Sequence, residues 1–330
     1  MDVSIVIPVK NGGELLDKVL AKVFEQKTQY QYEVICVDSG STDNSLEIIK
    51  KYPCKLYEVL PQDFGHGKTR NYGAGKGTGE FIIFLTQDAL PVNEEWLENF
   101  INAMKVDEDA AGGFGRHLPY PGCNVLDDRD INLHFKGFGE KTTVHWLEDK
   151  ARYDAEEGYR HFLAFFSDNN SCLRRSVWEK YPYADVNFSE DQIWMKQMIE
   201  LGYKRVYCPD AVVYHSHNYP LRTYFKRYYD EYKGVYQIHQ YRMFRSVPRM
   251  VYGILRITKA DMHYIWGKAN KIEHKIYWTY YAVVRNSFRC IAGYIAGRYE
   301  GYSEKKRNWL DRHISQQHDQ IYSKGGKDER

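Results

Sequence analysis

A carboxylate stands directly after a predicted strand in the first third of the chain. Residues 80–85 form the strand-like run EFIIFL, and Thr86, Gln87 and Asp88 follow it. Open α/β sheets place their ligand chemistry beyond the carboxyl ends of the strands. A carboxylate at such a strand end commonly holds a divalent cation against phosphate oxygens. Asp88 is therefore the first candidate site residue.

Other acidic residues occupy similar positions. Asp38 follows the apolar run at residues 34–37, and Glu190 and Asp191 open a predicted helix. A positioned carboxylate can take a proton from a substrate hydroxyl. Each of these residues also has a structural interpretation, because Asp38 could cap a helix or form a turn, and the acidic pair could complement the helix dipole.

Two histidines follow another predicted strand. His215 and His217 come after the apolar residues 212–214. An imidazole nitrogen suits Mn²⁺ better than Ca²⁺, although a histidine near a strand can equally be structural. One member of the pair is expected to act as a second metal ligand, and the sequence does not say which.

The elements that would position these side chains alternate between strands and helices. Residues 3–9 and 34–37 read as buried strands, and apolar residues at helical spacing follow each of them. This alternation predicts an α/β fold, with a mostly parallel sheet, right-handed crossovers and flanking helices. The stretch 112–159 shows no clear periodicity and is expected to be irregular.

The composition is that of a folded protein, with 43% hydrophobic and 27% charged residues in a chain of 330. The six cysteines include no CxxC pair, which argues against a zinc or disulfide framework and for a cytoplasmic protein. No uninterrupted apolar run reaches the roughly 18 residues that a spanning helix needs. The chain is not expected to cross a bilayer by itself.

The amino-acid composition and the charge change along the chain. We expect a catalytic domain at residues 1–220, a basic, Tyr-rich helical region at 221–315 and a flexible tail at 316–330. Between residues 222 and 307 there are eighteen Lys and Arg against six Asp and Glu. This region is expected to pack as helices with one side toward the inner leaflet of a membrane. Nucleic acid is not expected as a partner, because no RNA-binding motif is present.

Four motifs in order along the chain carry a family resemblance. They are residues 64–71 (FGHGKTRN), 84–89 (FLTQDA), 189–194 (SEDQIW) and 215–219 (HSHNY). Together with Asp38 they resemble the inverting glycosyltransferases of family 2, and among these the bacterial rhamnosyltransferases most closely. The resemblance covers about residues 3–225 and implies a GT-A fold, a Rossmann-like sheet flanked by helices, with a C-terminal helical extension and a nucleotide-sugar donor.

The resemblance assigns several residues to the donor. Asp38 would accept from the N3–H of a pyrimidine base, and Arg70 would donate to its carbonyl groups. Asp88 would bind the metal that neutralises the diphosphate, with Gln87 standing where the family usually has a second acidic residue. Further donor contacts are assigned to Pro8, Val9, Asn11, His66 and Lys68.

For the transfer itself, the resemblance places the base at the acidic pair. Asp191 is expected to deprotonate the acceptor hydroxyl. Glu190 is expected either to orient Asp191 or to act as the base in its place. Trp194, one turn further on, is either core or a platform under a sugar ring. A polar cluster that either hydrogen-bonds sugar hydroxyls or forms a turn consists of Asp168, Asn169 and Asn170.

These features predict a metal-dependent inverting glycosyltransferase, with Mn²⁺ or Mg²⁺ as cofactor. Asp38, Asp88 and Asp191 are expected to converge on one crevice. The resemblance favours transfer of L-rhamnose from dTDP-L-rhamnose to a hydroxyl of a cell-surface glycan or lipid-linked saccharide, in polysaccharide biosynthesis for the cell envelope. The alternatives are the same fold transferring another sugar from a UDP donor, and a non-catalytic GT-A binding or scaffold protein. The expected location is the cytoplasm or the cytoplasmic face of the membrane.

Overall fold

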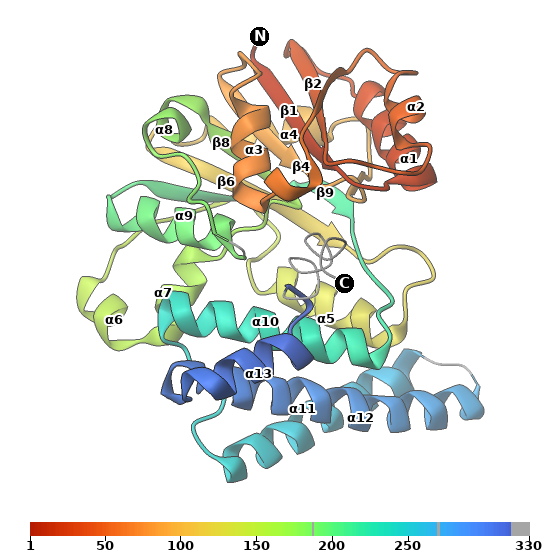
Figure 1. The fold of residues 1–330 in the computed structure, drawn as a ribbon, viewed down its shortest axis with the longest axis vertical. Helices are drawn as coiled ribbons and strands as arrows, with labels where there is room; N and C mark the ends of the chain where they lie inside the picture. The colour runs from red at the N-terminus through yellow and green to blue at the C-terminus, as the bar shows by residue number, and fades with distance from the viewer. Residues whose placement is uncertain (187, 269–270, 318–330) are drawn as a thin grey trace, which may run out of the picture. The chain divides into compact units, whose positions relative to one another are not determined.

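The computed structural model describes residues 1–186, 188–268 and 271–317 (Figure 1). The chain divides into two compact units. The first unit consists of residues 1–120 and 132–215, and the second of residues 121–131 and the chain from Ser216 onward. A short internal segment thus joins the C-terminal part of the chain, which the sequence did not indicate.

One half of the sheet in the first unit is parallel. The strands β1 (Val3–Val9), β2 (Tyr32–Asp38), β3 (Lys55–Glu58) and β4 (Phe81–Leu85) lie in the order β3-β2-β1-β4. The intervening helical elements are α1 (Gly13–Phe24), α2 (Ser45–Ile49), the 3-10 turn η1 (Pro61–Asp63) and α3 (His66–Ala74). The predicted alternation of strands and helices is therefore confirmed over this half.

The other half of the sheet is mixed, so antiparallel strands accompany the predicted parallel ones there. β8 (Asn170–Arg174) runs antiparallel to β4 and to β6 (Ala110–Leu118), whereas β9 (Lys204–Tyr214) runs parallel to β6. The short strands β5 (Leu90–Pro91) and β7 (Thr143–His145) run antiparallel to β9. Because β8 is reversed, the residues before it lie at the same sheet edge as the residues after β4.

Both faces of β1 are buried. Ile5 and Ile7 belong to the main core with Leu16 of α1. Val6 points to the opposite face, where a Cβ added to Gly73 of α3 would lie 2.4 Å from its Cγ1. The close approach of α3 to the sheet therefore requires a glycine at position 73. Further helices of this unit are α4 (Trp96–Met104), α8 (Arg175–Lys180) and α9 (Glu190–Glu200).

The stretch 112–159 is more regular than its sequence indicated. It contains most of β6, the strand β7, α5 (Val125–Lys136), α6 (Lys150–Ala155) and the start of α7 (Glu157–Ala164). Glycines interrupt the apolar pattern of β6. A Cβ at Gly115 would lie 2.1 Å from the Asn170 amide nitrogen, so close packing, and not a loop, explains this glycine.

The second unit is helical. It contains α10 (Leu221–His239), α11 (Val247–Lys268), α12 (Ile272–Ala296), the 3-10 turn η2 (Tyr299–Gly301), α13 (Glu304–Ile314) and the first residues of α5. Tyr229, Ala292 and Leu310 are buried together in one of its apolar clusters. Among the described residues, no helix has the length and apolar character needed to span a membrane.

The predicted tail at 316–330 lies outside the described residues from position 318 onward. The backbone N–H groups of Gln316 and Gln317 donate to Oδ2 of Asp230 at 2.7 and 3.0 Å. These two residues are therefore attached to α10.

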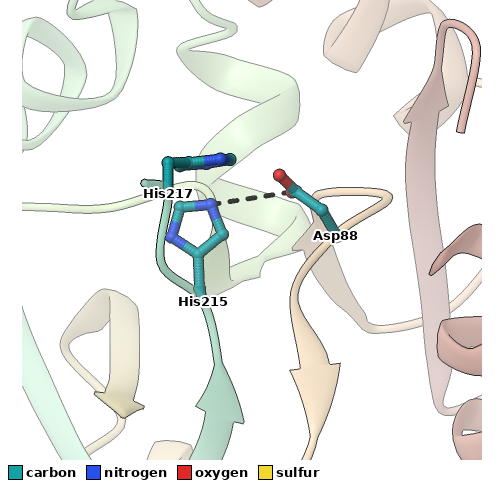
Figure 2. A group of neighbouring side chains, drawn as sticks. All are labelled: Asp88, His215 and His217. Carbon is teal, nitrogen blue, oxygen red and sulfur yellow. Dashed lines mark ion pairs between the residues drawn. The ribbon is translucent and has the colours of Figure 1, made fainter. Parts of the chain in front are cut away.

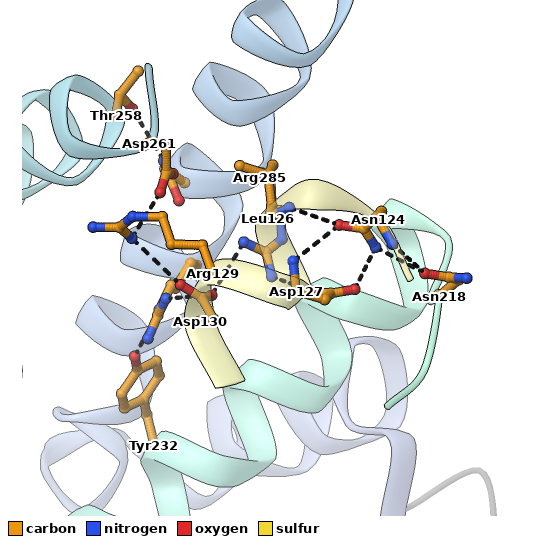
Figure 3. A network of polar contacts seen from close by, with 12 residues as sticks. Asn124, Leu126, Asp127, Arg129, Asp130, Asn218, Tyr232, Thr258, Asp261 and Arg285 are labelled. Atoms are coloured by element: carbon orange, nitrogen blue, oxygen red, sulfur yellow. Dashed lines mark hydrogen bonds and ion pairs between the residues drawn. The ribbon is translucent and has the colours of Figure 1, made fainter. Parts of the chain in front are cut away.

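An ion-pair network fixes the start of α5 within the second unit (Figure 3). Arg285 of α12 pairs with Asp127 and, at 3.1 Å, with Asp130. Arg129 of α5 pairs with Asp261 of α11 at 2.8 Å. Arg285 and Asp261 are buried, and breaking a buried ion pair leaves an uncompensated charge. The network therefore explains why residues 121–131 group with the helical unit.

Candidate active site

A buried arginine lies among carboxylates in the first unit. Nη1 of Arg70, on α3, lies 2.5 Å from Oε1 of Glu190, and its Nε lies 3.3 Å from Oδ2 of Asp168. All three side chains are at most 7% exposed. Burial alone would lower the pKa of Arg70, but the charges of Asp168 and Glu190 raise it. Arg70 therefore stays charged and compensates two carboxylates.

Asp191 belongs to the same cluster but has no such partner. Its Oδ1 accepts from the N–H of Gln192 at 2.7 Å, and its Oδ2 accepts from the N–H of Asp168 at 3.3 Å. In the described part of the chain, no Lys or Arg nitrogen lies within 4.0 Å of its carboxylate. Burial raises the pKa of Asp191 well above its usual range, and the charges of Asp168 and Glu190 raise it further. A carboxylate that holds a proton this readily is suited to act as a general base.

Asn71 and Tyr183 hold this cluster in place, and neither residue was predicted to have a role. The Asn71 side chain donates to the carbonyl of Tyr183 at 2.8 Å and accepts from its N–H at 3.1 Å. The Tyr183 hydroxyl in turn donates to Oδ1 of Asp168 at 2.8 Å. The available signal was the position of Asn71, directly after Arg70 in the same motif.

Asp88, His215 and His217 bring one carboxylate and two imidazoles together (Figure 2). Each offers one ligand atom, and these atoms lie within 4.8 Å of one another. Nε2 of His215 lies 3.6 Å from Oδ1 of Asp88, and the Tyr120 hydroxyl donates to the Asp88 carbonyl at 2.9 Å. Such spacing and this set of N and O donors fit a divalent transition-metal ion such as Mn²⁺.

Asn169 connects the two groups along one edge of the sheet. Its carbonyl accepts from the N–H of Thr86, the residue after β4, at 3.3 Å. Its side-chain nitrogen lies 3.5 Å from Nδ1 of His215. Asp168, the preceding residue, contacts Asp191. The structure therefore places Asp88 and Asp191 at the same edge, as the reversed direction of β8 requires.

Asn11 and Gln87 tie the neighbouring loops together. Oε1 of Gln87 accepts from the N–H of Lys10 at 2.8 Å, and Nε2 donates to the Lys10 carbonyl at 2.9 Å. Asn11 has a positive φ of 50°, and its side chain accepts from the N–H of Thr42 at 2.8 Å. These bonds join the loops after β1, β2 and β4. The predicted contacts of Asn11 and Gln87 with the nucleotide-sugar donor stay predictions.

Asp38 forms the turn after β2. Its Oδ2 accepts from the N–H groups of Gly40 and Ser41 at 2.8 and 2.9 Å, and the residue is 0% exposed. β2 lies two strands from β4, a separation of about 10 Å at the usual strand spacing. The expected convergence of Asp88 and Asp191 on one crevice stays a prediction. The buried Asp38 carboxylate has no surface open to a base.

Two predicted substrate residues fill the core. Asn170 is 0% exposed, and its side chain accepts from Trp96 at 3.0 Å and donates to the Ala211 carbonyl at 2.8 Å. Trp194 is 1% exposed and donates to the Tyr181 carbonyl at 2.6 Å. The structure therefore corrects their predicted contact with sugar, because neither has surface available for it.

The remaining residues that were predicted to contact the sugar donor lie at the end of β1 and in the first turn of α3. Val9 is buried, and its carbonyl accepts from the N–H of Ser39 at 2.9 Å. Pro8 and His66 are partly buried, and Lys68 is exposed. Their predicted contacts with the donor stay predictions.

The strand order and the carboxylates at the sheet edge define a glycosyltransferase-like fold of the GT-A type. The crystal structure of S. aureus TarS 1-349 matches it with a TM-score of 0.52 at 14% identity, over 97% of this chain and 83% of that chain. A complex of TarS 1-349 with UDP-GlcNAc has the same TM-score, over 90% of this chain and 92% of that chain. The likeness shows the fold.

The chain belongs to glycosyl transferase family 2, because the model of that family matches residues 4–179. O-antigen chain rhamnosyltransferase WbaN of Salmonella anatum is 32% identical over 232 residues, which is 69% of this chain and 70% of that protein. O-antigen chain rhamnosyltransferase RfbN of Salmonella typhimurium is 34% identical over 236 residues, 70% of this chain and 71% of that protein. The chain is thus a glycosyltransferase similar to rhamnosyltransferases.

The raised pKa of Asp191 predicts that Asp191→Asn stabilises the protein at neutral pH. The folded state holds this proton more tightly than the unfolded state, so its stabilising contribution is complete below the unfolded pKa of about 3.9 and is lost as the pH rises through the folded pKa. Asparagine does not titrate, so the variant loses no stability over that pH range. Each pKa unit of difference corresponds to about 1.4 kcal/mol. Chemical denaturation at pH 4 and pH 7.5 measures the effect.

The matched control is Asp210→Asn, which changes an exposed aspartate on β9. Its free energy of unfolding should stay within about 0.5 kcal/mol of the wild-type value at both pH values. An Asp191→Asn variant no more stable than the wild type at pH 7.5 would show that the cluster does not raise the pKa of Asp191.

Proposed function

We propose that the chain is a metal-dependent inverting glycosyltransferase that moves L-rhamnose from dTDP-L-rhamnose to a hydroxyl of a cell-surface glycan or lipid-linked saccharide. The observation that carries the proposal is the position of Asp191 beside an arginine that is already paired with two other carboxylates. The raised pKa of Asp191 is consistent with this arrangement. The names of WbaN and RfbN, both O-antigen chain rhamnosyltransferases, favour L-rhamnose as the sugar.

Asp191 is the proposed general base. The proton of the acceptor hydroxyl passes to a carboxylate oxygen of Asp191 while the acceptor oxygen bonds to the anomeric carbon of the donor sugar. The bond from that carbon to the nucleoside diphosphate breaks on the opposite face, and the diphosphate leaves with the electron pair. Inversion at the anomeric carbon follows from this geometry.

Glu190 and Arg70 act on Asp191 as positioning residues in this proposal. Glu190 is held by Arg70 at 2.5 Å, so its charge raises the pKa of Asp191 without competing for the proton of the acceptor. Arg70 was expected to contact the pyrimidine base. Its buried position between Glu190 and Asp168 supports a role in ordering the carboxylates instead.

The divalent cation is assigned to Asp88, His215 and His217. When bound, such an ion neutralises the negative charge that develops on the diphosphate leaving group. Gln87 is neutral and its side chain is bonded to Lys10. The two imidazoles would therefore supply the metal ligands that a second acidic residue supplies in other members of the family.

A second candidate function is transfer of a different sugar from a UDP donor. It is favoured by the fold neighbour TarS, which was crystallised in complex with UDP-GlcNAc. Both functions require the same base and the same metal, so a comparison of turnover with dTDP-L-rhamnose and with UDP-sugars separates them. A non-catalytic binding protein would turn over neither donor.

The exposed face of α11 and α12 supports contact with a lipid surface. Leu255, Trp266, Ile276 and Tyr280 are 65%, 47%, 61% and 71% exposed. Exposed basic residues accompany them, and the one exposed acidic residue along these two helices is Glu273. Apolar, aromatic and basic side chains together are typical of a helix that lies on an anionic membrane. We infer that this face brings the enzyme to lipid-linked acceptors.

Removing the base should stop transfer. Asp191→Asn is expected to lower kcat by about 10²- to 10⁴-fold while the protein stays folded, because asparagine keeps the shape but cannot accept the proton. The measurement is dTDP release from dTDP-L-rhamnose with a lipid-linked saccharide extract as acceptor. Asp210→Asn serves as the control and should retain wild-type turnover. Undiminished turnover in Asp191→Asn would refute the proposed base.

Removing the metal ligands should weaken Mn²⁺ binding. Asp88→Asn, His215→Ala and His217→Ala are each expected to raise the Kd for Mn²⁺ at least about tenfold, equivalent to 1.4 kcal/mol, as measured by electron paramagnetic resonance of free Mn²⁺. Chelation of the wild-type enzyme with EDTA should abolish transfer, and added Mn²⁺ should restore it. His263→Ala, on the exposed side of α11, is the control. Equal Mn²⁺ affinity in all four variants would place the metal elsewhere.

Replacing an exposed apolar residue of α11 should weaken membrane binding. Burial of a leucine contributes about 1.5–3 kcal/mol, so Leu255→Asp is expected to reduce binding to phosphatidylglycerol-containing vesicles at least about tenfold in a flotation assay. Val106→Asp changes a residue of similar exposure in the first unit, 62% against 65%, and should bind like the wild type. Equal losses in the two variants would contradict a specific lipid-facing side.

A further inference from the structure

A groove of about 700 Å³ lies within the second unit. Its walls are the start of α5, the segment after β9, the end of α11 and the first turns of α12. Every residue that lines it belongs to this unit. In the segment after β9, the first lining residue is Asn218, which directly follows His217. None of the residues of the Arg70 cluster lines the groove.

Aromatic rings form one wall of the groove. Tyr277 and Tyr281 of α12 are one turn apart and stack, with ring centroids 6.1 Å apart and an interplanar angle of 25°. Trp278 meets Tyr277 edge to face at 5.1 Å. Tyr277 is 56% exposed, so its ring is available to a ligand. Exposed rings of this kind offer flat apolar faces to a ligand, and the C–H faces of a sugar ring are flat and apolar.

Hydrogen-bonding groups also line the groove. Oδ1 of Asn218 accepts from both the side chain and the backbone N–H of Asn124, at 2.9 and 3.3 Å (Figure 3). The Asn218 carbonyl oxygen is thereby engaged, which leaves the NH₂ group of this amide as a donor. A donor beside aromatic rings suits a ligand that carries many hydroxyl groups.

The charges in the groove compensate one another. Nζ of Lys268 lies 3.7 Å from Oδ2 of Asp128, and the Tyr264 hydroxyl donates to the same oxygen at 2.5 Å. A phosphate or other anion entering the groove would therefore meet a carboxylate as well as an ammonium group. This arrangement disfavours an anionic ligand and favours a neutral one.

The walls of the groove are held rigidly by the buried ion pairs of α5. Arg285, one turn after Tyr281, pairs with Asp127 and Asp130 (Figure 3), and Arg289 reaches the same Asp130 oxygen at 3.0 Å. These pairs fix α5, which carries Asp128 and directly follows Asn124, against the helix that carries the aromatic rings. A site held in this way loses little conformational entropy when a ligand binds.

We propose that this groove binds a neutral saccharide segment of the acceptor glycan, with the sugar ring stacked on Tyr277 and a hydroxyl bonded to Asn218. The proposal rests on the proposed glycosyltransferase function, because it assigns the acceptor of that reaction a binding site in the helical unit. The groove thereby contributes to acceptor affinity and not to the chemical step.

The test is saturation-transfer NMR with the full chain and a set of neutral disaccharides of glucose, galactose, mannose and rhamnose. At least one of them should give a saturable signal with the wild-type protein, and Tyr277→Ala should reduce it at least fivefold. Tyr277→Phe, which keeps the ring, should retain the signal. Tyr252→Ala is the matched control, because Tyr252 is 66% exposed in the same helical unit and does not line the groove. Thermal unfolding checks that each variant is folded.

Three results would overturn the proposal. They are the absence of a saturable signal from the whole set, an equal signal from Tyr277→Ala and wild type, and displacement of the saccharide by glycerol phosphate, which would make the groove a lipid-headgroup site. Asp191→Asn separates this proposal from the proposed function, since it should bind the saccharide as the wild type does while losing transfer. In the transfer assay, Tyr277→Ala should raise the acceptor KM at least fivefold with kcat unchanged.

Discussion

The charge of Arg70 is the constraint on which the active site depends. One guanidinium lies among three buried or half-buried carboxylates and is within ion-pair distance of two of them. The third, on Asp191, is left with burial and like charges that favour its protonated form. Because one positive charge cannot compensate three negative ones, the cluster produces a base by leaving one carboxylate short of a partner.

The sheet brings this cluster and the Asp88 group together by reversing one strand. In an all-parallel sheet, residues 168–170 would lie at the opposite edge from Asp88. Because β8 runs antiparallel to β4, they lie beside Thr86 and His215 instead. The β-α-β-α half of the fold supplies Asp88 and Arg70, and the mixed half supplies Asp168 and His215.

The sequence predicted strands, helices and motifs better than it predicted contacts between residues far apart in the chain. The strands through Leu85 and the helix at Glu190 were readable because apolar spacing is a local signal. The partners of Arg70 are 98 and 120 residues away from it, so local spacing carries no trace of them. The strand β6 was not predicted because its glycines lack the apolar side chains by which a strand is recognised in a sequence. The burial of Asn170 and Trp194 was likewise invisible, since polar and amphipathic residues occur both in cores and at sites.

The side chain of Gln87 forms a pair of hydrogen bonds that an acidic residue at the same position could not both form. Its amide both donates to and accepts from the backbone of Lys10, which a carboxylate cannot do because it only accepts. A glutamate at this position would lose the bond donated to the Lys10 carbonyl and would repel that oxygen. An acidic residue at position 87 would therefore require compensating changes in the loop after β1.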